Sequence, residues 1–305
     1  VNHINNVDSY KVSGVEDKLP YINNIEKVLN TISSRNYDMM DRSLFTDEGW
    51  NVYQKLLKFG NARLLLPKDV NLNDYVEVVK FNDIYFCRSI PMQFSFTTNN
   101  KKFVENVIFE FSEDGKIESL QFALEKNTVD EITNMSLYSE GAKMIIINFL
   151  ENYKTAYALE RLEYIESIFS DNAQIIVGKV LKSKTNTYAE KGQNVSIEGQ
   201  RAIEYTHHTK KSFMTHLKRI FANNEFINLN FSNVSVRKIT KITDKNKFVI
   251  QLAQDYCSSS YSDKGYLLLL VDITNSDEPL IEIRTWQPDE IDLDKVFHEG
   301  MFYSN

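Results

Sequence analysis

Along this chain, apolar residues at helical spacing are followed by apolar residues at every second position, and this order occurs twice. It limits the fold more than any other feature. Apolar residues recur at helical spacing over residues 20–34 and 50–59, and the period changes to two after Pro67. Helical spacing returns over residues 144–157, and alternating runs then follow. Helices followed by strands are typical of an α+β domain, in which helices pack on one face of a sheet. We therefore expect two α+β domains.

The expected elements divide the chain into a flexible lead (1–14), a first domain (15–128), a polar linker (129–138) and a second domain (139–305). In the first domain, strands are predicted over residues 75–79, 84–90, 92–97, 103–111 and 117–124. The second domain is predicted to hold helices over residues 144–157, 162–169 and 210–221, and strands over 174–181, 226–236, 247–256, 265–273 and 280–286. Residues 182–201 are expected to form a long loop or an irregular hairpin.

A short match between the halves supports a tandem repeat of one fold. Leu44-Phe45-Thr46-Asp47 and Ile168-Phe169-Ser170-Asp171 follow a first helix at the same place in each half. Two copies of an apolar-Phe-hydroxyl-Asp step at equivalent positions indicate that one unit is repeated.

Charge and cysteine content exclude several classes of protein. The 35 Lys and Arg against 42 Asp and Glu give a net charge of −7, whereas a nucleic-acid-binding surface needs clustered basic charge. No segment reaches the roughly 18–20 apolar residues that span a bilayer. Cys87 and Cys257 are too far apart in sequence for a paired cysteine metal site, and we expect free thiols, with a disulfide left open. We expect no metal and no cofactor.

The start of the chain bears on location. It begins at Val1 and continues with a polar stretch, so we expect that an export signal preceded it and was removed. A trimmed end would look the same, and a cytoplasmic location stays open.

The second half carries a resemblance to a known family. Its order of helix, short helix, strand, helix and long strands resembles the nuclear transport factor 2-like fold, which ketosteroid isomerase shares. Residues 162–173 and the strands 265–273 and 280–286 carry the resemblance, and the first half matches in element order. It implies two cone-shaped domains, each with helices on a strongly bent antiparallel sheet. Segments 258–261 and 284–288 also resemble uncharacterised bacterial proteins of the cell envelope.

Asp255 and Tyr256 are the weak catalytic candidates. A buried Asp beside a Tyr can act as a general base and a hydrogen-bond donor, as an isomerase of this fold requires. The alternative is that Asp255 and Asp263 flank a surface turn while the tyrosines pack.

Glu282, Arg284 and Trp286 are the main candidates for ligand binding, together with Ser259 and Tyr261 in the serine-rich loop. The first three alternate along a predicted strand and so are expected to share one sheet face. A guanidinium between a carboxylate and an indole can hold an anion or stack on a flat ligand. The alternative is a structural ion pair on a covered sheet face.

The only histidine cluster, His207-His208 with His216, has no metal-site spacing, and we expect a solvated helix start with Thr206 or Thr209 as N-cap. No phosphate-binding or dinucleotide motif is present. We therefore expect a non-enzymatic tandem protein of the cell envelope that binds a small ligand or a protein partner. An isomerase or dehydratase using the second domain's pocket, and a scaffold protein, are the alternatives. A dimer stays open.

Overall fold

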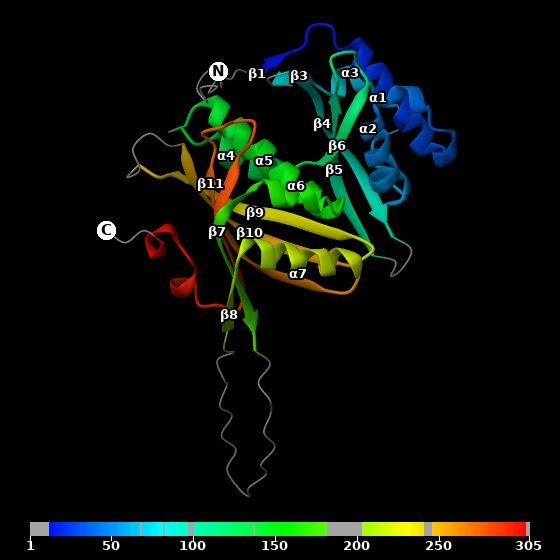
Figure 1. The fold of residues 1–305 in the computed structure, drawn as a ribbon. Coiled ribbons are helices and arrows are strands. Elements are labelled where there is room, and N and C mark those ends of the chain that lie inside the picture. The colour runs from blue at the N-terminus through cyan, green and yellow to red at the C-terminus, as the bar shows by residue number, and fades with distance from the viewer. Residues whose placement is uncertain are drawn as a thin grey trace, which may run out of the picture.

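The computed structural model describes residues 12–67, 69–81, 83–96, 101–136, 138–181, 203–240 and 246–302 (Figure 1). These residues form two six-stranded sheets, both curved and neither closed into a barrel, together with seven α-helices. The α+β class expected from the sequence is confirmed. Within the described residues, no helix is both long and apolar enough to span a bilayer.

The first sheet follows the order β1-β3-β4-β5-β6, and β2 pairs with β4. All of its strand pairs are antiparallel. The strands are β1 (Val12–Gly14), β2 (Arg63–Leu64), β3 (Val78–Phe81), β4 (Ile84–Ser95), β5 (Lys102–Phe111) and β6 (Ile117–Phe122). Its α-helices are α1 (Leu19–Ser33), α2 (Asp47–Val52) and α3 (Leu72–Tyr75), and the π-helical segment η4 (Tyr53–Lys58) continues α2.

The interior of the first domain is filled by aromatic side chains. One face of α1 buries Ile22, Ile25 and Val28 at helical spacing, as the sequence predicts. Five aromatic side chains of the same buried cluster are almost completely inaccessible to solvent, namely those of Tyr53, Phe94, Phe109, Phe111 and Phe122. The core of the first domain is therefore largely aromatic.

The second sheet follows the order β8-β7-β12-β11-β10-β9. The strands are β7 (Phe169–Val180), β8 (Ile203–His208), β9 (Ile227–Lys238), β10 (Lys247–Ser258), β11 (Ser262–Asp272) and β12 (Leu280–Pro288). Its helices are α5 (Glu140–Ala158), α6 (Leu162–Ser167) and α7 (Lys210–Ala222). The β7–β12 pair is parallel and the others are antiparallel, so the expectation of a wholly antiparallel sheet was wrong for this pair.

Two predicted elements of the first domain differ from the structure. The predicted strands 84–90 and 92–97 form one strand, β4, because Pro91, which separates them in the sequence, pairs with Asn106 inside the ladder and does not end the strand. The predicted strand 75–79 begins only at Val78, since α3 ends at Tyr75. The predicted loop 182–201 lies outside the described residues.

Part of the segment expected as a polar linker is helical. Helix α4 (Lys126–Thr133) packs on β9, where the Thr128 hydroxyl donates to the Phe231 carbonyl at 3.1 Å. The amide of Val234 donates to the Glu131 carboxylate at 2.8 Å, and Ile132 is buried. Because only a narrow side of α4 is buried, its sequence looks polar and unpatterned. The domain boundaries themselves remain predictions.

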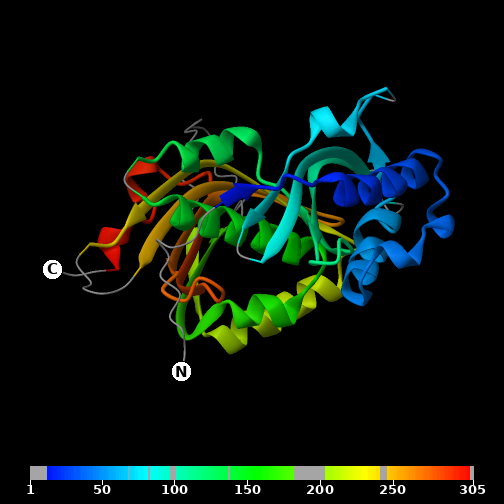
Figure 2. The same ribbon diagram turned by 90° about the horizontal axis from the view of Figure 1, so that it is seen from above.

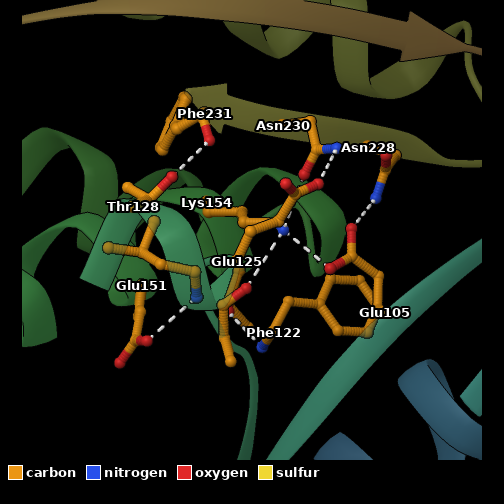
Figure 3. Close-up of polar contacts among 12 residues, drawn as sticks. Glu105, Phe122, Glu125, Thr128, Glu151, Lys154, Asn228, Asn230 and Phe231 are labelled. Carbon is orange, nitrogen blue, oxygen red and sulfur yellow. Dashed lines mark hydrogen bonds and ion pairs between the residues drawn. The ribbon is translucent and has the colours of Figure 1, made fainter. Parts of the chain in front are cut away.

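Helix α5 runs between the two sheets and is buried on nearly all sides (Figure 2). Toward the first domain, the Lys154 ammonium lies 2.6 Å from Glu105, and the Thr155 hydroxyl accepts from the Phe122 amide at 2.9 Å. Asn228 of β9 also donates to Glu105, at 2.6 Å. These side chains form one polar network that joins α5, the first sheet and β9 (Figure 3).

Candidate functional site

The second domain contains a cavity of about 1560 Å³ between α7 and the concave side of its sheet. Apolar side chains from α7 and the strands make up much of its wall, namely Val177, Phe213, Leu217, Ile220, Leu229 and Trp286. Ligand pockets commonly measure about 300–1,000 Å³ and have apolar walls with a few placed polar groups. This cavity is large enough for an organic ligand.

A bulge in β12 decides which side chains face the cavity. Leu270 pairs with Ile283 and Val271 with Ile281, so Glu282 is an extra residue in the ladder. The alternation therefore changes phase, and Ile281 packs in the inner core while Ile283 packs on the outer face. Beyond the bulge, Arg284 and Trp286 both line the cavity.

Arg284 is a buried cation without an ion pair in the described part of the chain. Arg284 is only 7% exposed, and its Nε donates a hydrogen bond to the Tyr153 hydroxyl at 3.1 Å. The guanidinium carbon lies 5.0 Å from the centre of the Phe213 ring. Burial disfavours the charge, but the hydroxyls of Tyr153 and Tyr157 raise the pKa of Arg284, so it stays charged. Its Nη1 is buried and has no hydrogen-bond partner among the residues that the structure describes.

Nε1 of Trp286 and Oε1 of Gln254 also lie in the cavity wall, buried and without a hydrogen-bond partner in the described part of the chain. Gly265 of β11 allows this arrangement, because a Cβ there would lie 2.9 Å from Cε2 of the indole and 2.2 Å from the Gln287 carbonyl oxygen. The indole therefore covers Gly265, which pairs directly with Gln254. Buried polar groups are usually hydrogen-bonded, so three such atoms in one wall indicate a place for a polar ligand.

Tyrosines and carboxylates gather at one side of the cavity. Burial raises the pKa of Asp263 to about 6, with further contributions from Asp289 and Glu290, while its hydrogen bond to Tyr261 lowers it. Burial raises the pKa of Tyr256 to about 12. This side thus holds a carboxyl that titrates near neutral pH beside neutral phenols.

Glu282 does not lie with Arg284, and the expectation that Glu282, Arg284 and Trp286 share a face was wrong. The Glu282 carboxylate forms an ion pair with Lys247, which also lies 3.9 Å from Asp272. The bulge is the physical reason, because an extra residue reverses the side to which the following side chains point.

Asp255 and Tyr256 do not form the expected acid–base pair. The Asp255 carboxylate is exposed and forms an ion pair with Lys264 at 3.0 Å. Tyr256 lines the cavity, because neighbouring residues of a strand point to opposite faces. Asp263, which the alternative interpretation placed beside a surface turn, lines the cavity together with Asp289 and Glu290.

The serine-rich loop is held by structural hydrogen bonds. The Ser259 hydroxyl accepts from the Glu225 amide at 2.8 Å and donates to Asn224 at 3.2 Å. The Lys101 ammonium of the first domain donates to the Ser258 carbonyl at 2.9 Å. Tyr261, two residues after Ser259, is 57% exposed and lines the cavity together with Ser258 and Ser260. Ser259 therefore fixes the loop, and of the two predicted loop residues only Tyr261 lines the cavity.

His207 and His208 end β8, and His216 of α7 lines the cavity. Thr209 is the N-cap, as predicted, and its hydroxyl accepts from the Ser212 amide at 3.2 Å. The His208 and His216 rings stack with centres 6.1 Å apart, and burial followed by the charge of His216 lowers the pKa of His208. Among the described residues, no group of three His, Cys, Asp or Glu side chains could hold a metal. Cys87 is buried and Cys257 is half-buried, and both thiols are free.

Sequence reasoning missed Gln254 and the tyrosine pair that supports Arg284. Tyr153 and Tyr157 are four residues apart on α5, and their hydroxyls lie 3.2 Å from each other. That spacing shows that they share a helix face, but not that β12 lies opposite. Gly265 at the start of the most apolar strand was an available signal of close approach by a neighbouring side chain.

Comparisons with known proteins identify the fold of the C-terminal region. Residues 199–282 match the family described as the Cds6 C-terminal NTF2-like domain, which confirms the nuclear transport factor 2-like fold expected there. No curated protein matches the chain.

Three solved structures resemble parts of the chain. Bd1075 of Bdellovibrio bacteriovorus is 15% identical, with 48% of this chain and 40% of that chain covered and a TM-score of 0.34. The helical cell shape determining protein Pgp2 of Campylobacter jejuni is 15% identical, with 47% and 41% covered and a TM-score of 0.31. ActVI-ORFA of Streptomyces coelicolor is 8% identical, with 50% and 100% covered and a TM-score of 0.33. The chain thus spans about 40% of the length of the first two.

Proposed function

We propose that this protein is a binding protein whose second domain holds a small organic anion in its cavity. The observation that carries this proposal is Arg284, a buried guanidinium that lines a cavity with apolar walls and whose Nη1 has no partner within the described residues. A buried charge without a counter-charge is costly, and proteins keep such groups mainly where a ligand supplies the opposite charge.

In this proposal the first domain binds no ligand itself and instead supports the cavity of the second domain. The core of the first domain is filled by aromatic side chains, and its polar contacts to α5 hold one side of that helix. The opposite side of α5 carries Tyr153, which hydrogen-bonds Arg284. The tandem arrangement therefore fixes the tyrosine that orients the guanidinium.

The proposal is tested by titrating the protein with benzoate, octanoate and their neutral amides while the melting temperature is recorded. We expect the carboxylates, and not the amides, to raise the melting temperature. Arg284→Met should abolish this rise, because the charge that selects the anion is removed. Arg219→Met is the matched control, since Arg219 also lines the cavity but is exposed on α7. An equal rise with Arg284→Met would refute the proposal.

A second candidate function is acid–base catalysis at the other side of the cavity. Asp263 favours it, because a carboxyl with a pKa of about 6 that hydrogen-bonds Tyr261 suits a general base. We expect a small cyclic ketone to exchange its α-protons for deuterium faster with the protein than in buffer, with a rise around pH 6. If Asp263→Asn exchanges as fast as the wild type, this candidate is wrong.

We extend the proposal to the cell envelope as the location. Support comes from the sequence resemblance of segments 258–261 and 284–288 to envelope proteins. Fractionation of the source cells, with detection by antibody, tests it, and recovery in the cytoplasmic fraction alone would contradict it. A protein partner or a second copy of the chain at the cavity belongs to the same proposal. Sedimentation velocity with and without ligand tests for a second copy, because a dimer sediments faster than a monomer.

A further inference from the structure

We propose that the ligand is an N-acylated α-amino acid, either free or as the last residue of a short peptide, bound through its carboxylate and the adjacent N–H. This inference rests on the proposed function and names the chemistry of its ligand. It follows from three buried polar atoms, two donors and one acceptor, that line the cavity and have no partner among the described residues.

The two donors match the two oxygens of one carboxylate. Nη1 of Arg284 and Nε1 of Trp286 belong to alternate residues of β12, which are about 7 Å apart along the strand and point to the same face. Both side chains are long enough to converge on one group, and each donor needs an oxygen at about 2.9 Å. A carboxylate provides two such acceptors, whereas a hydroxyl or a ketone provides one oxygen.

The acceptor requires a donor on the ligand beside that carboxylate. Gln254 is paired across the sheet with Gly265, and the indole of Trp286 lies over Gly265. Gln254 thus lies directly across the ladder from the residue that the indole covers. A carboxylate flanked by an N–H, as at the end of an acylated amino acid, satisfies all three atoms, whereas a simple fatty acid leaves Gln254 unpaired.

The charge of the wall fits one negative charge. Arg284 is the one cation among the buried residues that line the cavity in the described part of the chain, and its other neighbours are the hydroxyls of Tyr153 and Tyr157. A phosphate monoester would bring nearly two charges to one guanidinium, with the carboxylates Asp263 and Asp289 on the same cavity wall. The apolar wall beside Phe213 and Leu217 suits an apolar side chain or acyl group.

The test compares three probes by isothermal titration calorimetry at pH 7. N-acetyl-phenylalanine has the carboxylate and the N–H, 3-phenylpropanoate has only the carboxylate, and N-acetyl-phenylalaninamide has only the N–H. We expect N-acetyl-phenylalanine to bind about 3- to 10-fold more tightly than 3-phenylpropanoate, the range that one hydrogen bond supplies. The amide should show no measurable binding. Glycyl-glycyl-phenylalanine distinguishes the sources, since tighter binding than N-acetyl-phenylalanine assigns the site to a peptide end.

Two variants isolate the contribution of Gln254. Gln254→Met should remove the preference for N-acetyl-phenylalanine and leave the affinity for 3-phenylpropanoate unchanged. Gln251→Met is the matched control, because Gln251 lies on the same strand but donates to the Phe297 carbonyl at 2.7 Å. Its preference should equal that of the wild type.

The outcomes separate this inference from the proposed function. Equal affinity of the wild type for N-acetyl-phenylalanine and 3-phenylpropanoate, with loss of both in Arg284→Met, would overturn the ligand class and leave the anion site standing. Absence of Arg284-dependent binding for every carboxylate would overturn both. The wild-type comparison needs no variant, so a poorly folding variant does not block the test.

Discussion

Replacing Arg284 by methionine should make the free protein more stable while it removes ligand binding. The guanidinium is 7% exposed, forms no carboxylate ion pair in the described residues, and leaves Nη1 without a partner. Methionine has a similar length and can pack its thioether against the Phe213 ring that the guanidinium now covers. The Tyr153 hydroxyl keeps its hydrogen bond to Tyr157 at 3.2 Å.

The expected size follows from the contacts of the guanidinium. Burying an ion costs several kcal/mol even after the protein relaxes. The hydrogen bond to Tyr153 returns about 1.5–3 kcal/mol and the contact with Phe213 returns up to about 2 kcal/mol. Near pH 7, far below the ordinary tyrosine pKa of about 10, Tyr153 and Tyr157 are neutral and give the guanidinium no charge–charge attraction. At that pH the charge is therefore unfavourable by about 1–2 kcal/mol in the free protein. A rise in melting temperature of about 3–6 °C should accompany its removal.

Thermal unfolding followed by circular dichroism measures the change, and Lys247→Met is the matched control. Lys247 is a buried cation in the same sheet, but it is paired with Glu282 and lies near Asp272. Removing it leaves two carboxylates without their cation, so the control should lose about 2–4 kcal/mol. The two buried cations should thus respond with opposite signs.

One result would refute this reasoning. If Arg284→Met lost as much stability as Lys247→Met, the fold itself would hold the guanidinium in a favourable place. Arg284 would then be a structural residue, and its unpaired Nη1 would be no evidence for a ligand.

Three further predictions concern the contacts between the two domains. Lys154→Met should lower the free energy of unfolding, measured by urea denaturation, by about 3–5 kcal/mol, because Lys154 is 1% exposed and its loss leaves Glu105 buried without a cation. The double variant Lys154→Met with Glu105→Gln should lose less stability than Lys154→Met alone. Phe226→Ala should cost about 3–5 kcal/mol, since its ring stacks 4.5 Å from Phe96 of the first domain, and a cost below about 1 kcal/mol would show that this stack contributes little. Burial and the charge of Glu151 raise the pKa of Glu110 to about 7, so its contribution to stability is present below about pH 4.3 and is lost as the pH rises to 7. Glu110→Gln should therefore be more stable than the wild type by about 2 kcal/mol at pH 8 and equal to it at pH 4, and a pH-independent difference would contradict this origin.

The position of α5 explains why these predictions connect two regions. Lys154 and Thr155 contact the first domain, while Tyr153 and Tyr157 of the same helix face Arg284. A helix buried on both sides transmits a shift at one side to the other, because packed interiors have little free volume. Lys154→Met should therefore also weaken binding of a carboxylate at temperatures where the protein is still folded.

The sequence by itself determined the class of the fold and most of its elements. Periodic apolar positions predicted α1, α5 and α7 and the long strands of both sheets, because side chains that repeat every 3.6 or every 2 residues must bury one face. The polar helix α4 was missed, since only Thr128 and Ile132 of its residues are buried. Hydrophobic periodicity predicts a helix only where one face of that helix is apolar and buried.

Only the tertiary structure decided the candidate site. Arg284 and Trp286 were predicted to lie on one face, but Glu282 was included with them because a bulge does not change the composition of a strand. Asp263 replaced Asp255 for a related reason, since which residues of a hairpin face the cavity depends on its register with neighbouring strands. Tyr153 lies 131 residues from Arg284 in the chain, and no local pattern could show their contact. Local sequence predicts which residues of a strand share a face, whereas only the tertiary packing determines which side chains that face contacts.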